Sequence, residues 1–263
     1  MVAPRGFGII VPARYASTRL PAKALRDLCG KPLTVRVWEN ALRVGADFVL
    51  VATDDERIAS VVRAEGGQVV MTSPSHPTGT DRLAEVVQLR GLSPETVVVN
   101  VQGDEPLLEP ELVRGVAEAL LARPRAGIAT LATPIRGAPE LFDPNVVKVV
   151  LDAEGYAGTF SRAPLPWVRG VFVPGEVPQE LPADVPFLRH VGLYAYRAAT
   201  LLTVAAAPQV PHERAESLEQ LRACHLGIPI HVTVVAEPPG HGVDTEEDLR
   251  KVQAIFAARQ REP

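Results

Sequence analysis

The chain has 263 residues, of which 46% are hydrophobic and 22% are charged, and its formal net charge is −4. This composition is ordinary for a globular protein. No apolar run reaches the roughly 18 residues that a membrane-spanning helix requires. The sequence also lacks the long basic run that would favour nucleic acid as the main partner. Two cysteines without metal-type spacing, and an N-terminal stretch without a signal peptide's apolar core, lead us to expect a cytoplasmic protein with no membrane partner.

In the first half of the chain, short apolar runs alternate with amphipathic segments. The runs are rich in Val and Ile and are continuous, as expected for strands covered on both faces. We predict strands at residues 7–11, 48–52, 68–71, 97–101 and 128–133, and helices near 33–44, 55–64, 81–89 and 110–122. Repeated strand–helix units predict an α/β fold with a doubly wound, mostly parallel sheet.

The pattern changes near residue 141. We predict a hairpin formed by 146–151 and 157–161, an extended arm or lid in the proline- and glycine-rich segment 164–186, a strand at 187–196, helices at 198–206 and 215–225, a strand at 230–235 and a closing helix at 245–258. Asp244 or Thr245 is the expected N-cap of the closing helix. The chain is interpreted as one domain, 1–263, with a core at 1–140 and 215–263 and an inserted subdomain at about 141–214.

The loop after the first predicted strand carries three cations, Arg14, Arg19 and Lys23, among small residues and prolines. In open α/β sheets, ligands bind at the carboxyl ends of the strands, near a switch in strand order. The loop matches neither the dinucleotide fingerprint nor the P-loop. Arginine forks and a lysine point charge nevertheless suit a polyanion such as a triphosphate. A solvated surface loop is the alternative that spacing alone leaves open.

Two acidic segments supply candidate metal ligands. Asp104 follows a buried strand in VVVNVQGDEP, at the same edge of the predicted sheet as the cationic loop, and Asp244 lies in GVDTEED near the C-terminus. Mg²⁺ prefers one or two carboxylates together with substrate phosphates and water, so this pair favours a magnesium site. A turn or cap role is the alternative for Asp104, and a helix N-cap is the alternative for Asp244.

Further polar residues follow later strands. Residues 78–80 (TGT) place hydroxyls and amides at a predicted helix start, which is a common anion site. His190 and Tyr194 share parity on one strand, so both would face one cleft. Glu213 and Glu216 are three apart and would share a helix face. The alternatives are structural: a simple cap, a satisfied histidine and solvated charges.

The sequence offers no catalytic nucleophile, since G-x-S-x-G and a plausible Cys–His pair are both missing. The candidate residues all suit positioning and charge neutralisation. That set favours nucleotidyl transfer, in which metals and cations stabilise the transition state and the acceptor attacks directly. A non-catalytic nucleotide-binding module is the alternative from another class; loss of Asp104 or Lys23 would favour it, and both are present.

Eight segments occur in this order: IIVPARYASTRLPAKAL, VATDDERIA, TGTDRLAEV, VVNVQGDEPLL, VKVVLDAEGYAGTFSRAPLPW, LRHVGLYAYR, ESLEQLR and GVDTEEDL. The ordered set strongly resembles the family of CMP-Kdo synthetases, the 3-deoxy-manno-octulosonate cytidylyltransferases. Any one motif is only moderately specific, whereas the set in this order is very specific. It runs from about residue 7 to residue 249, nearly the whole chain.

The resemblance implies a Rossmann-like nucleotidyltransferase core that converts CTP and Kdo to CMP-Kdo and pyrophosphate with Mg²⁺. It also implies a cytoplasmic homodimer that serves lipopolysaccharide synthesis, with the insert used for sugar binding and dimerisation. The catalytic residues that it implies are Lys23, Arg14, Asp104 and Asp244, the last two as Mg²⁺ ligands. The implied nucleotide-binding residues are Pro12, Ala13, Arg14, Arg19, Lys23, His76, Gly79 and Thr80. The implied sugar-binding residues are Arg82, Gln102, Arg162, His190, Tyr194, Glu213 and Glu216.

Several positions depart from the family pattern. Ala22 stands where many members have glycine, so it must adopt an allowed conformation without a glycine's freedom. Ser73 and Ser75 stand where relatives often carry an arginine and an aspartate, which weakens the carry-over of nucleotide contacts there. Val210 and His212 replace an expected serine and leucine before the sugar-proximal helix. A related sugar acid, 8-amino-Kdo or sialic acid, is the alternative substrate.

Overall fold

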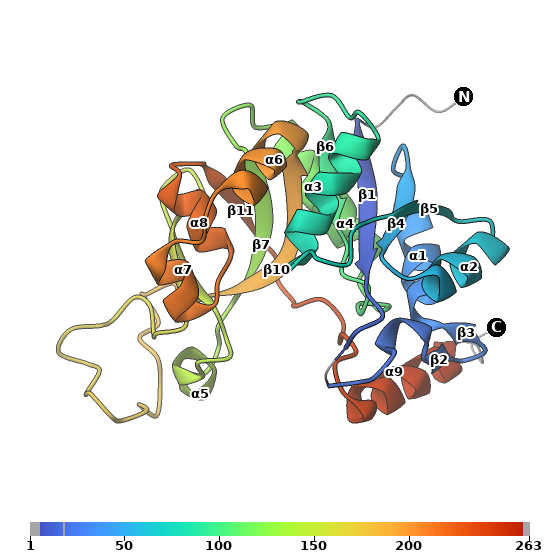
Figure 1. Cartoon of the computed structure of the whole chain (residues 1–263). Coiled ribbons are helices and arrows are strands. Elements are labelled where there is room, and N and C mark those ends of the chain that lie inside the picture. Colours follow the sequence, from blue (N-terminus) through green and yellow to red (C-terminus); the bar gives the residue numbers. More distant parts are fainter. Residues whose placement is uncertain (1–5, 18, 260–263) are drawn as a thin grey trace.

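The computed structural model describes residues 6–17 and 19–259. Within this part of the chain a nine-stranded sheet forms the centre of the molecule, with the order β11-β7-β10-β6-β1-β4-β5 along its main path (Figure 1). These strands are β1 (Phe7–Ala13), β4 (Val49–Thr53), β5 (Gln68–Met71), β6 (Val97–Asn100), β7 (Ile128–Pro134), β10 (Leu188–Arg197) and β11 (Ile230–Val234). Neighbours are parallel except at β10, which is antiparallel to both β6 and β7. The predicted α/β fold with a mostly parallel sheet is confirmed.

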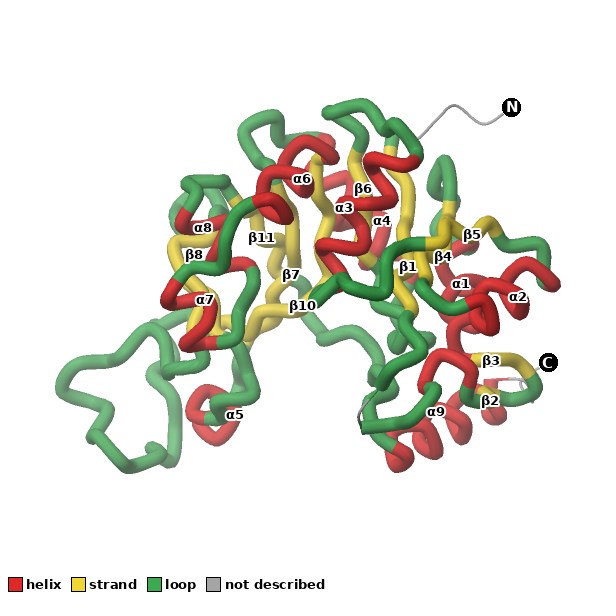
Figure 2. The backbone as a smooth tube through the Cα atoms, viewed as in Figure 1, coloured by secondary structure: helices red, strands yellow, loops and turns green. Residues whose placement is uncertain are grey.

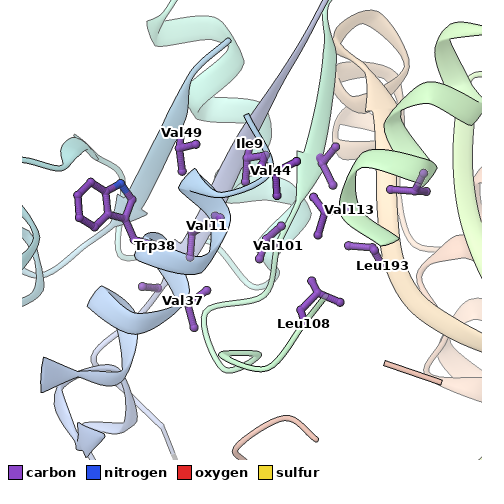
Figure 3. Packing of buried hydrophobic residues seen from close by; sticks show 14 of the residues in the cluster. Ile9, Val11, Val37, Trp38, Val44, Val49, Val101, Leu108, Val113 and Leu193 are labelled. Atoms are coloured by element: carbon purple, nitrogen blue, oxygen red, sulfur yellow. The ribbon is translucent and has the colours of Figure 1, made fainter. Parts of the chain in front are cut away.

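Helices cover both faces of the sheet, and each face has its own apolar core. One face carries α1 (Leu33–Leu42), α2 (Glu56–Ala64) and α4 (Pro110–Leu121), and the other carries α3 (Gly79–Leu89), α6 (Ala198–Ala206) and α8 (Gln220–His225). Helix α9 (Glu246–Arg259) extends the first core beyond the ends of the strands. Along β1, Ile9 and Val11 pack into the first core (Figure 3), while Ile10 packs into the second. Because successive side chains of a strand point to opposite faces, burial on both sides produces the continuous apolar runs of the sequence.

The predicted hairpin and arm lie beside this sheet. The strands β8 (Lys148–Leu151) and β9 (Ala157–Ser161) pair with each other, and β8 also pairs with the start of β10. The segment 162–187 between β9 and β10 contains no helix or strand and runs as an irregular loop (green in Figure 2). A small core around Phe172 and Phe187 ties this segment to the fold.

The predicted helix at 215–225 is wrong in its extent. The structure has two short helices, α7 (Pro211–Glu216) and α8, separated by Ser217, whose φ of 52° is left-handed. The break is fixed by Glu213, whose carbonyl accepts a hydrogen bond from the amide of Leu218 at 3.2 Å. A residue in the left-handed conformation ends a helix and redirects the chain.

Other elements also differ from the prediction. Both β10 and α6 lie within the segment predicted as an insert, yet β10 is hydrogen-bonded at the centre of the main sheet. The 3-10 helix η1 (Lys23–Leu25), the paired strands β2 (Asp27–Leu28) and β3 (Lys31–Pro32), and α5 (Ala138–Phe142) are too short to show periodicity in the sequence. Among the described residues, no helix is both long and apolar enough to span a bilayer.

Candidate active site

A cleft of about 340 Å³ opens at the carboxyl ends of β1 and β6. The two strands are parallel neighbours, but the chain continues from β1 to β4 on one side and reaches β6 on the other. The strand order therefore reverses at this point, which is where open α/β sheets bind ligands. The cleft is lined by Pro12, Ala13, Arg14, Ser17, Arg19, Lys23, Ala24, His76, Pro77, Thr78, Gly79, Arg82, Gln102, Gly103, Asp104 and Asp244.

Two backbone features shape the floor of the cleft. Gly103 lies so close to β1 that an added Cβ would stand 2.6 Å from the carbonyl oxygen of Pro12, so only glycine allows the two strand ends to approach. Ala22 has φ 51° and ψ 35°, the left-handed conformation that glycine adopts more readily. The η1 turn starts directly after Ala22 with Lys23, whose side chain reaches the cleft.

Lys23 joins the two predicted metal ligands. Its Nζ donates to Oδ2 of Asp104 at 2.6 Å and to Oδ1 of Asp244 at 3.0 Å. Arg19 donates from Nη2 to the same oxygen of Asp244 at 2.9 Å. A backbone hydrogen bond of 2.7 Å, from the amide of Val243 to the carbonyl of Asp104, holds the two acidic segments together.

Thr245, and not Asp244, caps α9. Oγ1 of Thr245 accepts the amide of Asp248 at 3.2 Å, and the carboxylate of Asp248 accepts the amide of Thr245 at 2.9 Å. This reciprocal pattern is a capping box with aspartate in the usual place of glutamate. The carboxylate of Asp244 therefore faces Lys23 and Arg19 instead of serving the helix.

Glu105 follows Asp104 and lies near other acidic side chains. Burial, and then the charges of Asp104, Glu109 and Asp244, raise the pKa of Glu105 to about 7. Burial is the main cause of this shift, and the neighbouring carboxylates add to it.

Asp104 and Asp244 fit a divalent cation with oxygen ligands. One ammonium group contacts both carboxylates within 3.0 Å, so oxygens of both can reach a single cation. Their side chains are 31% and 44% exposed, which leaves room for water and phosphate oxygens. Within residues 6–17 and 19–259, no group of three or more His, Cys, Asp or Glu side chains is suited to a metal. Two carboxylates completed by substrate oxygens are the arrangement that Mg²⁺ commonly uses.

The opposite wall of the cleft is the start of α3. Thr78 caps this helix, because its Oγ1 accepts the amide of Asp81 at 3.2 Å, and Gly79 lines the cleft beside it. Thr80 points elsewhere: its side chain is buried, and its Oγ1 donates to Oε2 of Glu219 at 2.8 Å. The cleft thus includes two of the three residues of the TGT motif, and the structure does not support a direct ligand contact for Thr80.

His76 also lines this wall, and its ring is held from behind. Its Nε2 lies 2.5 Å from Oε2 of Glu85, an oxygen that also accepts the amide of Ser73 at 2.8 Å. Ser73 and Ser75, which depart from the family pattern, bind each other through their hydroxyls at 2.7 Å. The two departures therefore form a local turn that supports the position of His76.

Two of the predicted sugar-binding residues, Arg82 and Gln102, line the same cleft. Arg82 is only 3% exposed, and its guanidinium donates to Oγ1 of Thr72 at 2.5 Å and to Oδ2 of Asp54 at 3.0 Å. These partners fix the orientation of Arg82. Gln102 lies just beyond the end of β6, two residues before Asp104.

His190 and Tyr194 form a second group, on β10, outside the lining of the cleft. Their ring centroids are 5.3 Å apart, as their shared parity predicts, and Tyr194 is in register with Asn100 near the end of β6. Burial lowers the pKa of His190 to about 3, so its ring is neutral at pH 7. Between them, a Cβ added to Gly192 would meet none of the described residues within 4 Å.

Arg162 and Glu216 bind each other at the edge of this second group. The amide of Arg162 donates to Oε2 of Glu216 at 2.6 Å, and its Nε donates to the carbonyl of Glu216 at 2.6 Å. Glu213 is different, because it is only 4% exposed and accepts two hydrogen bonds from Arg222, at 3.0 and 2.5 Å. Because Glu213 is buried and Arg222 engages both of its oxygens, while Glu216 is only half-buried, the structure does not support the predicted sugar contact of Glu213.

Glu219 is a functional candidate that the sequence interpretation did not single out. Its carboxylate accepts the hydroxyl of Thr80 at 2.8 Å and lies 3.2 Å from the hydroxyl of Thr78, so it links the α7–α8 segment to the wall of the cleft. Burial is the main reason that its pKa is raised. Glu219 stands in the motif ESLEQLR, but a continuous helix from residue 215 conceals the turn that directs it toward α3.

Residues 8–230 match the family model described as Cytidylyltransferase. A 3-deoxy-manno-octulosonate cytidylyltransferase from Aliivibrio salmonicida (strain LFI1238) is 53% identical over 251 residues, which cover 95% of this chain and 99% of that protein. The enzyme of the same name from Aliivibrio fischeri (strain MJ11) is 52% identical, with the same coverage. The chain therefore spans nearly the full length of these relatives.

Two solved structures resemble the chain as a whole. A CMP:2-keto-3-deoxy-manno-octonic acid synthetase complexed with CTP has a TM-score of 0.86 and 40% identity, over 96% of this chain and 99% of that chain. A cytidylyltransferase from Leptospira borgpetersenii serovar Hardjo-bovis (strain JB197) has a TM-score of 0.60 and 14% identity, over 96% of this chain and 87% of that chain. At that low identity, the second likeness concerns the fold alone.

Proposed function

Because the chain belongs to the family of 3-deoxy-manno-octulosonate cytidylyltransferases, we propose that it transfers CMP from CTP to the anomeric hydroxyl of 3-deoxy-D-manno-octulosonate (Kdo). The products are CMP-Kdo and pyrophosphate. The observation that carries the proposal is the meeting of Lys23, Asp104 and Asp244 at the carboxyl ends of β1 and β6. One cleft thus offers carboxylates for a metal and cations for a triphosphate.

In this proposal the triphosphate lies along the cationic loop after β1. Arginine forks match phosphate oxygens, and the lysine adds a mobile charge. Gly79, at the amino end of α3, offers the wall where helix amides favour an anion. The proposed nucleotide contacts, all from the lining of the cleft, are Pro12 and Ala13 beside the cytosine, with Arg14, Arg19, Lys23, His76 and Gly79. Thr80 acts indirectly, by holding Glu219.

Asp104 and Asp244 are the proposed ligands of Mg²⁺. When bound, the ion would neutralise phosphate charge and polarise the α-phosphate. The chain's own contribution is to keep the two carboxylates within reach of one cation, through the bond from Val243 to Asp104. Lys23 contacts both carboxylates, and its flexible stem allows its ammonium to turn toward the phosphates.

The sugar acid is proposed to bind between the cleft and β10. The antiparallel pairing of Tyr194 with Asn100 places β10 next to the end of β6, two residues before Gln102. Neutral His190 and Tyr194 suit sugar hydroxyls, and Nη2 of Arg162, which donates to no described residue, suits a carboxylate. The proposed sugar contacts are Arg82, Gln102, Arg162, His190, Tyr194 and Glu216, without Glu213.

The reaction is a direct displacement. The anomeric oxygen forms a bond to the α-phosphorus, the bond from that phosphorus to the bridging oxygen breaks, pyrophosphate leaves, and the hydroxyl proton passes to water. Because both substrates are anions, the cations of the loop lower their repulsion as they approach. The residues on strand ends hold the two reactants in line, which removes entropy from the barrier.

The proposal includes a homodimer formed through the arm. Four apolar side chains of this segment are prominently exposed: Trp167 (44%), Val171 (51%), Val173 (50%) and Val177 (55%). Apolar groups gathered on one exposed segment favour a protein contact. The hairpin and arm, at about 141–187, would serve sugar binding and dimerisation, while the rest of the chain forms the core. As the family resemblance implies, we place the enzyme in the cytoplasm and its product in lipopolysaccharide synthesis.

Pyrophosphate release tests the proposal. The purified protein is incubated with Mg²⁺, with CTP, UTP or ATP as the donor, and with Kdo, 8-amino-Kdo or sialic acid as the acceptor. We expect the fastest release with CTP and Kdo. If no pair of substrates releases pyrophosphate, the proposed enzymatic activity is refuted. A preference for UTP or ATP would refute CTP as the donor, and a preference for 8-amino-Kdo or sialic acid would refute Kdo as the acceptor.

A further inference from the structure

Lys148 is a buried cation that the proposed mechanism does not use. Its side chain is fully buried, and Nζ donates to the carbonyls of Asp143, Val146 and Arg162 at 2.9, 2.5 and 2.6 Å. An ammonium has three donors, so all three are engaged. Burying a charge is unfavourable even when it is hydrogen-bonded, and burial lowers the pKa of Lys148. A methionine would avoid that penalty but would leave the three carbonyls without a donor, so the charge serves the backbone that these carbonyls belong to.

The three carbonyls connect Lys148 to Arg162. The partners at Asp143 and Val146 bracket the loop before β8, and within this loop the carbonyl of Pro144 accepts Nη1 of Arg162 at 2.9 Å. The third partner is the carbonyl of Arg162 itself. Lys148 therefore fixes the backbone of Arg162 directly and its guanidinium through the loop.

Glu216 holds the other side of the same guanidinium. Nε of Arg162 donates to the Glu216 carbonyl at 2.6 Å. With Nε and Nη1 both committed, the plane of the guanidinium is set, and Nη2 is the nitrogen that donates to no residue in the described part of the chain. The direction in which Nη2 can donate to a carboxylate depends on this plane, because the N–H bonds of a guanidinium lie within it.

We propose that Lys148 is a positioning residue for the sugar acid: it orients Arg162, and Arg162 receives the carboxylate of the sugar. This inference rests on the proposed function and deepens it. Loss of the Lys148 ammonium leaves three carbonyls unpaired and frees the loop that holds Arg162. The effect falls on the sugar acid alone, because none of Lys148, Arg162 and the 143–146 loop lines the nucleotide cleft.

The test is Lys148→Met, with Lys251→Met as the matched control on exposed helix α9, where Lys251 only pairs with Glu247. We expect the KM for Kdo to rise about tenfold or more in Lys148→Met, which corresponds to about 1.4 kcal/mol. The Kd for CTP, measured by calorimetry without sugar, should stay within about twofold. A KM for Kdo within about twofold of wild type, or an equal loss of CTP affinity, would overturn the inference.

Two further variants separate positioning from general damage. On an Arg162→Ala background, Lys148→Met should raise the KM for Kdo by less than about twofold, because its route of action is already removed; full additivity contradicts the inference. If Lys148→Met does not fold, Asp143→Ala replaces it. That carboxylate accepts the amide of Asn145 at 2.8 Å and shapes the same loop. Asp143→Ala should raise the KM for Kdo, and an unchanged KM refutes the idea. An inactive wild type would instead refute the proposed function.

Discussion

Lys23, Asp104, Asp244 and Arg19 form a charge cluster that balances itself: two cations meet two carboxylates in one part of the cleft. The cluster is partly exposed, so its ion pairs contribute little to folding. These ion pairs can instead be replaced when ligands bind. A triphosphate would bind the two cations, and a divalent cation would bind the two carboxylates.

Replacing Asp104 or Asp244 by alanine should abolish turnover and leave the fold intact. We expect the rate of pyrophosphate release to fall at least about 100-fold, because transition-state charge loses its stabilisation. The free energy of unfolding should change by less than about 1 kcal/mol for such partly exposed pairs. Urea titration and rate measurements at saturating Mg²⁺ check both parts. Glu237→Ala, which removes an exposed pair with Arg136, is the control. Near-normal rates at saturating Mg²⁺ would contradict the assignment of Asp104 and Asp244 as metal ligands.

Ala22 should tolerate glycine better than any ordinary helical alanine. A left-handed alanine is strained by about 1 kcal/mol, and glycine removes that strain while adding somewhat less unfolded-state entropy. Ala22→Gly should therefore keep or raise the free energy of unfolding, by up to about 1 kcal/mol. The control Ala254→Gly, at an exposed position inside α9, should lower it by about 1 kcal/mol. Equal losses in urea titrations of both variants would contradict the strain at Ala22.

At the scale of elements, apolar patterning predicts most of the fold. The strands at 68–71 and 157–161 and the helix at 198–206 match the structure at both ends. The first strand runs two residues beyond its apolar run, because Pro12 and Ala13 continue the register with β4. The sequence also predicted that the cations and Asp104 meet, because they follow two strands of one parallel sheet and such strands bring their carboxyl ends to one edge.

Features that depend on distant partners could not be read from the sequence. Glu213 and Arg222 pair across the break between α7 and α8, and no local pattern signals that pair. The same holds for Thr80. Its place in the TGT motif predicts a cleft residue, but its hydroxyl donates to Glu219, which is distant in the sequence. Arg162 and Glu216 were selected by resemblance, but their mutual hydrogen bonds appear only when β9 meets α7.

The arm makes a prediction of its own. If it forms the dimer, wild type should have twice the 28.2 kDa mass of the chain, and the double variant Val171→Asp, Val177→Asp should have the single mass. Buried charges without partners are strongly unfavourable in an apolar interface. Light scattering after size exclusion gives both masses. Leu89→Asp, at a side chain that is 60% exposed on α3, is the matched control and should leave the dimer intact. A monomeric wild type, or a double variant that remains a dimer, would reject this role of the arm.

At the scale of the whole molecule, one strand connects the two halves of the proposed reaction. The cleft lies at the reversal between β1 and β6, and β10 enters the sheet antiparallel beside β6. This insertion brings Tyr194 beside Asn100 at the end of β6, with the ring centroid of His190 5.3 Å from that of Tyr194. His190 and Tyr194 therefore lie on the central sheet itself, and their burial affects the stability of the entire fold.

That burial predicts an acid-sensitive stability. His190 has a pKa of about 3 in the folded protein and an ordinary value of 6.5 when exposed. Between these values the unfolded chain binds a proton that the folded chain does not, so the free energy of unfolding falls as the pH falls from 6.5 toward 3. A single group contributes at most about 1.4 kcal/mol per pH unit.

The variant His190→Gln cannot titrate but keeps a hydrogen-bonding group for Thr130, so its stability should decline less steeply between pH 6.5 and pH 3. Urea titrations at pH 7.5, 6.0 and 5.0 compare the two proteins. Their difference in free energy should stay constant above pH 6.5 and should shift in favour of His190→Gln below it; parallel curves throughout would show that His190 titrates normally in the folded protein.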